Sequence, residues 1–200
     1  MIRRVVCIVE GHGEIRAVPI LIRRIARECD PPRYDMEIPQ PIRKPANQLV
    51  RSGELEREVQ LAALEAGPSG AVLILLDCDL LQDCPAQLGP EYLRRAQGAR
   101  PDVPMCMVLA RREFEAWFLA AAESLRGQRG LADNLEPPDE PELLKGPKEW
   151  LSERMGHHRG YSPTLDQAAL AQMFDMNLAR QRSRSFAKFY SDVEKLLTMP

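Results

Sequence analysis

Several features that would assign this chain of 200 residues to a particular class are missing from its sequence. No stretch approaches the roughly 18 consecutive apolar residues of a membrane-spanning helix, so no membrane association is expected. The formal net charge is −2, so the chain lacks the overall basic character of many nucleic-acid-binding proteins. The short apolar run near the N-terminus ends in acidic residues rather than in small residues, which argues against a signal peptide.

Cysteine and histidine are also scarce in the arrangements that bind metals. The chain has five cysteines and three histidines, and no two cysteines form a C-x-x-C pair. A four-ligand zinc site needs such paired spacings, so structural zinc is not expected. Because the number of cysteines is odd and no secretory signal is visible, we expect free thiols and a cytoplasmic protein.

The sequence has no nucleotide-binding fingerprint either. The glycine-containing segment 10–14, EGHGE, lacks both the GxGxxG spacing and the GK[ST] of a P-loop. We expect Gly11 and Gly13 to permit a tight turn from a strand into a helix, which would hold Glu10 and Glu14 at a crevice. His12 is expected to be an exposed residue of that turn.

What the sequence does contain is an alternation of strand-like and helix-like segments. Short apolar runs predict strands over 4–9, 72–79 and 103–110, with a shorter strand over 34–38. Apolar residues at helical spacing predict helices over 15–28, 54–66, 90–97, 111–125, 147–155, 163–173 and 183–199. Ser52 is the expected N-cap of the second helix, and Gly67-Pro68 its end.

This alternation is typical of an α/β fold. We predict a mostly parallel four-stranded sheet with helices on both faces, followed by a C-terminal helical extension. The expected organisation is an α/β domain over 1–126, a loop or linker over 127–146, which is rich in Gly, Pro, Asp and Glu, and a helical extension over 147–200 that packs on the domain.

The run from Val72 to Asp79, VLILLDCD, organises the rest of the chain. Side chains alternate along a strand, so Asp77 and Asp79 are expected to point to the same side at its C-terminal end. In open α/β sheets this edge faces the crevice where ligands bind. Two carboxylates so close repel each other unless a proton, a basic group or a metal lies between them, and oxygen ligands suit Mg²⁺ or Mn²⁺.

Three predicted strands end in acidic residues, and in a parallel sheet these ends lie at one edge. We therefore expect the carboxylates to converge if their strands are neighbours, although any single acid at a strand end is as well explained by simple exposure to solvent. Basic residues nearby could face substrate phosphates, with a solvated surface role as the alternative. The acids are Glu10, Glu14, Asp77, Asp79, Glu113 and Glu115, and the basic residues are Arg111, Arg112, Lys145 and Lys148.

Three segments in this order resemble a known family. VEGHGE, LILLDCD and REFEAWFLA, with a tail containing YSPTLDQAAL and SRSFAKFY, look like domain-of-unknown-function family 4276. A glutamate after the first strand and a later D-x-D also resemble the Toprim domain, and the family is similar to Toprim nucleases of the overcoming-lysogeny-defect type. The resemblance implies a Toprim-like, Rossmann-like fold, and often an AAA or ABC-type ATPase partner in phage-defence loci.

The resemblance also implies roles for individual residues. Glu10 matches the Toprim glutamate, a metal ligand and proposed general base or acid, and Asp77 and Asp79 match the metal-binding D-x-D. Glu14 matches a second acid of the nuclease branch, while Glu113 and Glu115 match an E-x-E-A-W segment without an established role. Our hypothesis is a Mg²⁺-dependent nuclease with Glu10, Asp77 and Asp79 as catalytic residues. A second ion would use Glu14 with Glu115 or Asp83.

Two other functions stay open at this point. One is a regulatory or adaptor subunit of an ATPase complex, with little or no chemistry of its own and with the helical tail as the interface. The other, a phosphatase of the haloacid-dehalogenase type, is the weakest interpretation, because that class places its aspartates after the first strand, whereas here D-C-D-L-L comes later.

Overall fold

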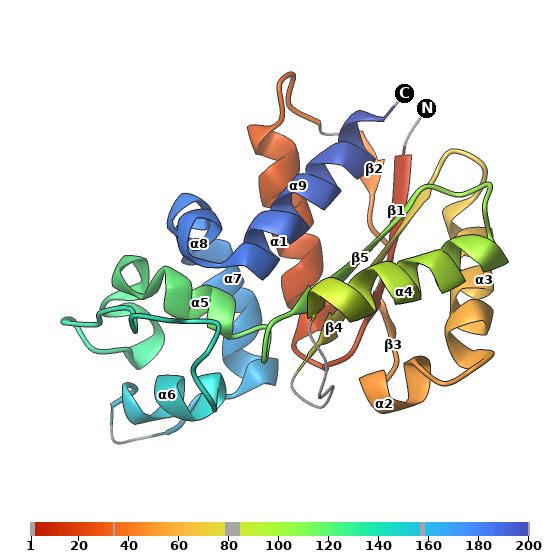
Figure 1. Cartoon of the computed structure of the whole chain (residues 1–200). Helices are drawn as coiled ribbons and strands as arrows, with labels where there is room; N and C mark the ends of the chain where they lie inside the picture. Colours follow the sequence, from red (N-terminus) through yellow and green to blue (C-terminus); the bar gives the residue numbers. More distant parts are fainter. Residues whose placement is uncertain (1–2, 34, 79–84, 157–158, 200) are drawn as a thin grey trace.

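The protein is described by a computed structural model that covers residues 3–33, 35–78, 85–156 and 159–199 (Figure 1). Its sheet has five strands: β1 (Arg3–Val9), β2 (Met36–Glu37), β3 (Ile42–Arg43), β4 (Ala71–Asp77) and β5 (Met105–Ala110). The strand order is β2-β1-β4-β5, and β3 also pairs with β1. Every pairing is parallel, so the predicted α/β fold with a parallel sheet is confirmed.

The outer strand beside β1 differs from the prediction because it is divided. β2 pairs with the beginning of β1, and β3 pairs with its end. Pro39 and Pro41 lie between the two pieces. Proline has no N–H to donate to a ladder, which explains why an edge strand is interrupted there. The resulting turn brings the chain after β3 close to the end of β1.

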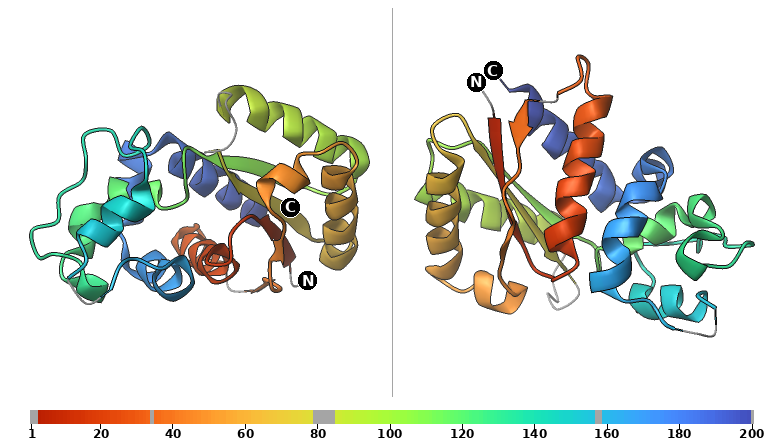
Figure 2. Two further views of the ribbon diagram at one scale, coloured as in Figure 1. Left: turned by 90° about the horizontal axis from the view of Figure 1, so that it is seen from below. Right: turned by 180° about the vertical axis from the view of Figure 1, so that it is seen from behind.

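Helices cover both faces of the sheet (Figure 2). They are α1 (Glu14–Glu28), α2 (Ala46–Leu49), α3 (Glu54–Ala66), α4 (Pro85–Ala99), α5 (Ala116–Ala120), α6 (Pro147–Glu153), α7 (Ala168–Met173), α8 (Met176–Arg182) and α9 (Arg184–Thr198). Two 3₁₀ turns, Ala122–Leu125 and Gln128–Gly130, and a π-helical turn, Pro163–Gln167, complete the regular structure of the described residues. No helix among these residues has both the length and the apolar character needed to cross a bilayer.

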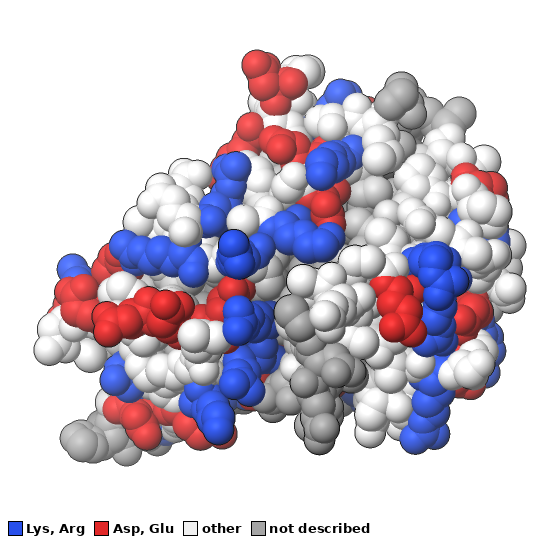
Figure 3. Space-filling view, in the orientation of Figure 1, with Lys and Arg blue, Asp and Glu red and all other residues white. Residues whose placement is uncertain are grey.

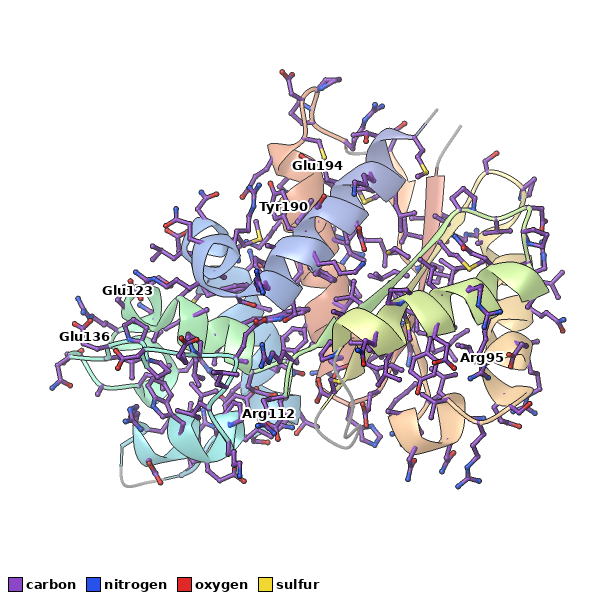
Figure 4. The ribbon with its side chains drawn as sticks, viewed as in Figure 1. Arg95, Arg112, Glu123, Glu136, Tyr190 and Glu194 are labelled. Atoms are coloured by element: carbon purple, nitrogen blue, oxygen red, sulfur yellow. The ribbon has the colours of Figure 1, made fainter. Side chains whose placement is uncertain are left out.

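Alternation along β1 divides the core into two halves. Val6 and Ile8 pack with α3 and α4, while Val5, Cys7 and Val9 face α1 and α9. All of these strand side chains are at most 2% exposed, as expected for a parallel strand covered on both faces. The helices are also tied to one another by polar contacts: Figure 4 shows Arg95 between α4 and α3 and Tyr190 between α9 and α1. The sheet is therefore a rigid support for whatever its C-terminal edge carries.

Several predicted helix boundaries were wrong. The helix over 54–66 has the predicted bounds and ends at Gly67, whose φ of 72° is the left-handed conformation that glycine adopts easily. Ser52 does not cap the N-terminus of this helix, because Gly53 is the N-cap residue and no side chain of the described residues forms a capping hydrogen bond there. α4 begins at Pro85, before the predicted start at Pro90, and continues through that proline. Tyr92 and Ala96 of this helix are buried in the core.

The predicted helix over 111–125 begins later than expected and is divided into α5 and the 3₁₀ turn Ala122–Leu125. Arg112 has a φ of 66°, which is outside the helical region, and the regular helix α5 is only five residues long. Every residue of α5 is buried, so an apolar spacing of 3.6 could not show its bounds. α8 was not predicted, and Ser183 separates it from α9 by accepting a hydrogen bond from Phe186 N at 3.0 Å.

Other sequence-based expectations can be compared with the fold directly. Trp117 is fully buried, as expected for a core residue, and His12 is exposed in the turn after β1. Segment 127–146 has little regular structure, and its Leu131 and Leu135 are buried in the same core as α1 and α9. The described cysteines are buried and form no disulfide with one another: Cys7, Cys29, Cys78 and Cys106.

Candidate metal centre

The carboxylates after β1 and β4 meet because these two strands are neighbours. Val9 is in register with Leu75, so Glu10 lies beside the end of β4. Glu10 Oε2 accepts a hydrogen bond from Asp77 N at 3.1 Å. Asp77 Oδ1 in turn accepts a hydrogen bond from Phe114 N, beyond the end of β5, at 2.8 Å. Three adjacent strand ends are thus joined through two carboxylates, each held in place by a backbone amide.

Glu14 closes the turn between β1 and α1. Its Oε2 accepts a hydrogen bond from Glu10 N at 3.1 Å, and its side chain is only 3% exposed. A Cβ atom at Gly11 would lie 2.8 Å from Glu14 Oε1, so the glycine is needed for this close approach rather than for an unusual φ. Glu14 therefore points back into the site, and one of its oxygens holds the turn that positions Glu10.

The other glycine of the turn leaves room for a segment from far along the chain. A Cβ atom at Gly13 would lie 2.0 Å from Gln167 Oε1 and 2.6 Å from the carbonyl oxygen of Pro163. Both residues belong to the π-helical turn, a geometry often found at functional sites. The C-terminal part of the chain is thereby brought against the strand ends.

Gly13→Ala is expected to destabilise the protein by about 1–3 kcal/mol, because the added methyl group forces the π-helical turn away from the start of α1. The measurement is urea unfolding, with Gly98→Ala as the control, since Gly98 is exposed in α4 and a Cβ atom there meets nothing within 4 Å. Equal stability of Gly13→Ala and wild type would show that the two segments are not packed as described.

Glu115 is the most deeply buried acid of the site. It is fully buried, and its Oε1 accepts hydrogen bonds from Tyr161 Oη at 2.9 Å and from Gln167 Nε2 at 3.2 Å. Its other oxygen, Oε2, is buried without a hydrogen-bond partner among the described residues. A buried carboxylate oxygen without a donor is costly, so this atom is a natural contact point for a cation.

Lys148 of α6 supplies a positive charge to the cluster. Its Nζ lies 3.2 Å from Glu113 Oε2 and 3.6 Å from Glu115 Oε2. Burial alone would lower the pKa of this lysine, but the carboxylates of Glu115, Asp77 and Glu113 outweigh that effect and raise it. Lys148 is therefore charged at neutral pH, and it belongs to the acidic site rather than to a separate basic surface.

The electrostatics of the pocket favour protonation of its acids. Burial is the main reason why the pKa values of Glu10, Asp77 and Glu115 are raised. For Asp77, repulsion by Glu14 and Glu115 adds to the effect, and its pKa lies well above the usual range. Burial together with the charge of Glu115 raises the pKa of Glu14 to about 7. One lysine does not neutralise four acids, so the pocket attracts further positive charge.

The pocket itself has a volume of about 360 Å³. It is lined by side chains and backbone from three parts of the chain, namely the turn after β1, the ends of β4 and β5, and the segment from α6 to the π-helical turn. The lining residues are Glu10, Gly11, His12, Gly13, Glu14, Asp77, Glu115, Lys148, Pro163, Thr164 and Gln167. Such a volume accommodates a phosphate group with ions or water.

The donor set fits a hard cation in its chemistry, since the pocket offers carboxylate oxygens and one of them, on Glu115, has no hydrogen-bond donor in the described ranges. Within the described part of the chain, however, no three acidic, histidine or cysteine side chains are already grouped as a metal site. Asp79 and Asp83, which the sequence analysis included, lie outside the described residues. A metal would be held by Glu10 and Asp77 together with a ligand such as Asp79.

The remaining predicted residues lie apart from the pocket. Glu113 is half-buried and pairs with Lys148, but it does not line the pocket. Figure 4 shows Arg112 near α6, at the lower end of the sheet. Arg111 and Lys145 are both exposed, and Arg111 lines a different pocket.

Two functional residues were missed at the sequence level. Tyr161 and Gln167 donate hydrogen bonds to Glu115, yet their segment YSPTLDQAAL supported only a predicted helix and the family resemblance, and no role was assigned to either residue. Gly13 is the residue that could have pointed to Gln167. Its backbone dihedral angles are ordinary for a helix, so a glycine is required there because another segment approaches closely.

Comparison with known proteins gives a family for this fold and site. The family described as Domain of unknown function (DUF4276) matches residues 9–194, which is nearly the whole chain. The chain belongs to this family. No curated protein and no solved structure gave a significant match. The match includes Glu10, Asp77, Glu115 and Lys148, so the site lies within the family domain.

Proposed function

We propose that this DUF4276 domain is a Mg²⁺- or Mn²⁺-dependent nuclease of the Toprim type. The observation that carries the proposal is the convergence of the carboxylates of Glu10, Asp77 and Glu115 on one pocket at the C-terminal edge of the sheet. The order of the acids along the chain, a glutamate after β1 and a D-x-D after β4, is similar to that of Toprim nucleases.

The residues of the chain have distinct tasks in this proposal. A divalent cation held by Glu10 and Asp77, with Asp79, would polarise the scissile phosphate and favour ionisation of a water. Glu10 is half-buried, and burial raises its pKa, so it is suited to accept the proton of the attacking water. The backbone amide of Phe114 fixes the direction of the Asp77 carboxylate.

Glu10 is the proton acceptor for phosphodiester hydrolysis in this proposal. The water oxygen forms a bond to phosphorus, its proton passes to Glu10, and the bond from phosphorus to the leaving sugar oxygen breaks, with solvent protonating that oxygen. Lys148 contributes positive charge beside the reacting phosphate, and Tyr161 and Gln167 keep the Glu115 carboxylate in place. The negative charge of the substrate phosphate is thus balanced by the divalent cation and by Lys148.

Glu10→Gln is the variant that tests the proposal. The glutamine can still accept the hydrogen bond from Asp77 N through its oxygen, but it loses the negative charge that binds a cation and accepts a proton. We expect wild type to bind Mg²⁺ or Mn²⁺ in calorimetry and to cleave single-stranded or duplex DNA or RNA. In the variant, cleavage should fall by at least about 10³-fold.

Glu91→Gln is the control, because Glu91 is an exposed acid of α4 away from the pocket and should leave cleavage unchanged. Cleavage by Glu10→Gln at the wild-type rate would disprove the assigned site. If wild type binds no divalent cation and cleaves nothing, the nuclease proposal fails, and the regulatory or adaptor role in an ATPase complex becomes the better account.

A further inference from the structure

A second pocket lies between α4, β5 and α9, with a volume of about 370 Å³. β5 is the outermost strand on this side of the sheet, so the pocket opens along a sheet edge. Met107 and Leu109 of β5 contribute apolar side chains, and Gly89 and Pro90 of α4 line it from the other side. The acidic pocket uses none of these residues.

The pocket is rich in positive charge. Arg111, Arg184 and Lys188 line it, and all three are exposed. Lys188 forms an ion pair with Asp192. Arg111 and Arg184 form no hydrogen bond or ion pair with any residue in the described ranges. Figure 3 shows lysine and arginine side chains gathered on the same face as α4 and α9. Two such uncompensated cations at the rim of a pocket favour an anionic ligand.

One acid contributes a different kind of contact. Glu142 lines the pocket and is 7% exposed. Its Oε1 accepts hydrogen bonds from Ser183 Oγ at 2.7 Å, from Ser185 N at 2.8 Å and from Ser185 Oγ at 2.5 Å. The carboxylate is therefore fixed, and it provides an acceptor inside a pocket whose rim is cationic. Such a combination suits a ligand with an anionic end and an N–H donor at its other end.

The segment that follows β5 connects this pocket with the acidic site. Arg111 directly follows Ala110, which is in register with Asp77. The amide of Phe114, only three residues after Arg111, donates to Asp77 Oδ1. A chain-like ligand that places one phosphate at the acidic pocket can thus extend along this edge towards Arg111 and α9.

We propose that the pocket between α4, β5 and α9 binds one unpaired nucleotide of a single-stranded nucleic acid, next to the phosphodiester that is cut at the acidic pocket. This inference rests on the nuclease function proposed above and narrows its substrate. The nucleotide phosphates contact Arg111, Arg184 and Lys188, the base packs against the apolar walls, and a base N–H donates to Glu142. A stacked, paired base of a duplex does not enter such a pocket.

The charged part is tested with Arg184→Gln/Lys188→Gln. Binding of fluorescein-labelled single-stranded 8-mers of DNA and RNA is measured by anisotropy with Ca²⁺ in place of Mg²⁺. We expect the Kd to rise at least tenfold, and the slope of log K against log salt to become shallower by about 0.7 for each phosphate that the protein no longer neutralises. Lys195→Gln is the matched control, because Lys195 lies on the same helix and also pairs with Asp192 but does not line the pocket.

The apolar part is tested with Gly89→Phe. Because a Cβ atom at Gly89 meets nothing within 4 Å, the helix can accept a side chain that fills the pocket, and Gly89→Ala is the control that leaves it open. We expect Gly89→Phe to raise the Kd for single strands at least fivefold with an unchanged salt slope, since every cationic side chain is retained. Circular dichroism and urea unfolding verify that each variant is folded.

Two results would overturn the inference without touching the nuclease proposal. One is that both pocket variants have the same Kd and KM as wild type, while wild type cleaves nucleic acid. The other is an equal weakening of binding in Lys195→Gln, which would indicate only general attraction to positive charge. Absence of cleavage in wild type, with binding that still depends on the pocket variants, would refute the nuclease and retain the nucleotide site.

Discussion

Asp77→Asn is expected to abolish metal-dependent cleavage, by at least about 10³-fold, and to make the protein more stable at pH 8. The asparagine keeps an Oδ1 atom to accept the hydrogen bond from Phe114 N. It removes a buried negative charge that is repelled by Glu14 and Glu115. A residue that is costly to the fold and is nevertheless present is expected to be needed for function.

The gain in stability should depend on pH, and its sign follows from the direction of the pKa shifts. Burial and like charges raise the pKa of Asp77 in the folded protein. The folded state therefore binds protons more tightly than the unfolded state, and the free energy of unfolding falls as pH rises through the raised pKa. Glu14 contributes in the same direction between its usual pKa of 4.5 and about 7.

Urea unfolding at pH 5 and pH 8 checks this prediction. Because burial and like charges raise the pKa of Asp77, the difference in stability between the two proteins should be smaller at pH 5 than at pH 8, where Asp77→Asn should be more stable by roughly 1–3 kcal/mol. Asp102→Asn serves as the control, because Asp102 is an exposed partner of Arg100 and its removal should bring no gain. A variant less stable than wild type at pH 8 would contradict the description of the pocket as overcharged.

Lys148→Met is expected to have the second large effect, a loss of about 2–3 kcal/mol of stability at pH 8. The lysine lines the acidic pocket, and Glu115 beside it is fully buried. Removing one partner of a buried pair leaves the other charge without compensation. The expected loss of stability is smaller than for a fully buried pair because the Lys148 side chain is 36% exposed to solvent.

Two comparisons make this prediction specific. Lys145→Met removes the same charge from an exposed position three residues earlier and should change stability little. Lys148→Met/Glu115→Gln should recover most of the stability, because the buried charge is then absent as well. Urea unfolding of wild type, Lys148→Met, Glu115→Gln and the double variant gives the coupling free energy between the two side chains. Additive effects of the two substitutions would show that Lys148 and Glu115 do not interact.

The sequence by itself determined the sheet and its edge. Unbroken apolar runs at 5–9 and 72–76 can only be satisfied by burial on both faces, and the helices between them require parallel strands. Since parallel strands end at one edge, Glu10 and Asp77 were expected to meet if their strands were neighbours, and the structure shows that β1 and β4 are neighbours. These inferences depend on local pattern and on chirality, which a sequence displays directly.

The composition of the site was decided by the tertiary structure. Lys148, Tyr161 and Gln167 reach Glu115 from the segment after β5, and nothing in the sequence pattern of that segment predicts a contact with Glu115. Their place depends on how this segment packs against α1 and α5, which is a property of side-chain shape and of contacts between distant residues. The same is true of α5, where complete burial removes the periodicity that would have marked its bounds.

The division of the positive charges was likewise invisible in the sequence. Arg111 and Lys148 had the same two interpretations in the sequence, contact with substrate phosphates or exposure to solvent, yet one lines the pocket between α4 and α9 while the other lies among the acids. The difference arises because the chain turns sharply at Arg112, with a φ of 66°, and because α6 folds back over the end of the sheet. Charge can be counted in a sequence, but the groups it compensates are set by the fold.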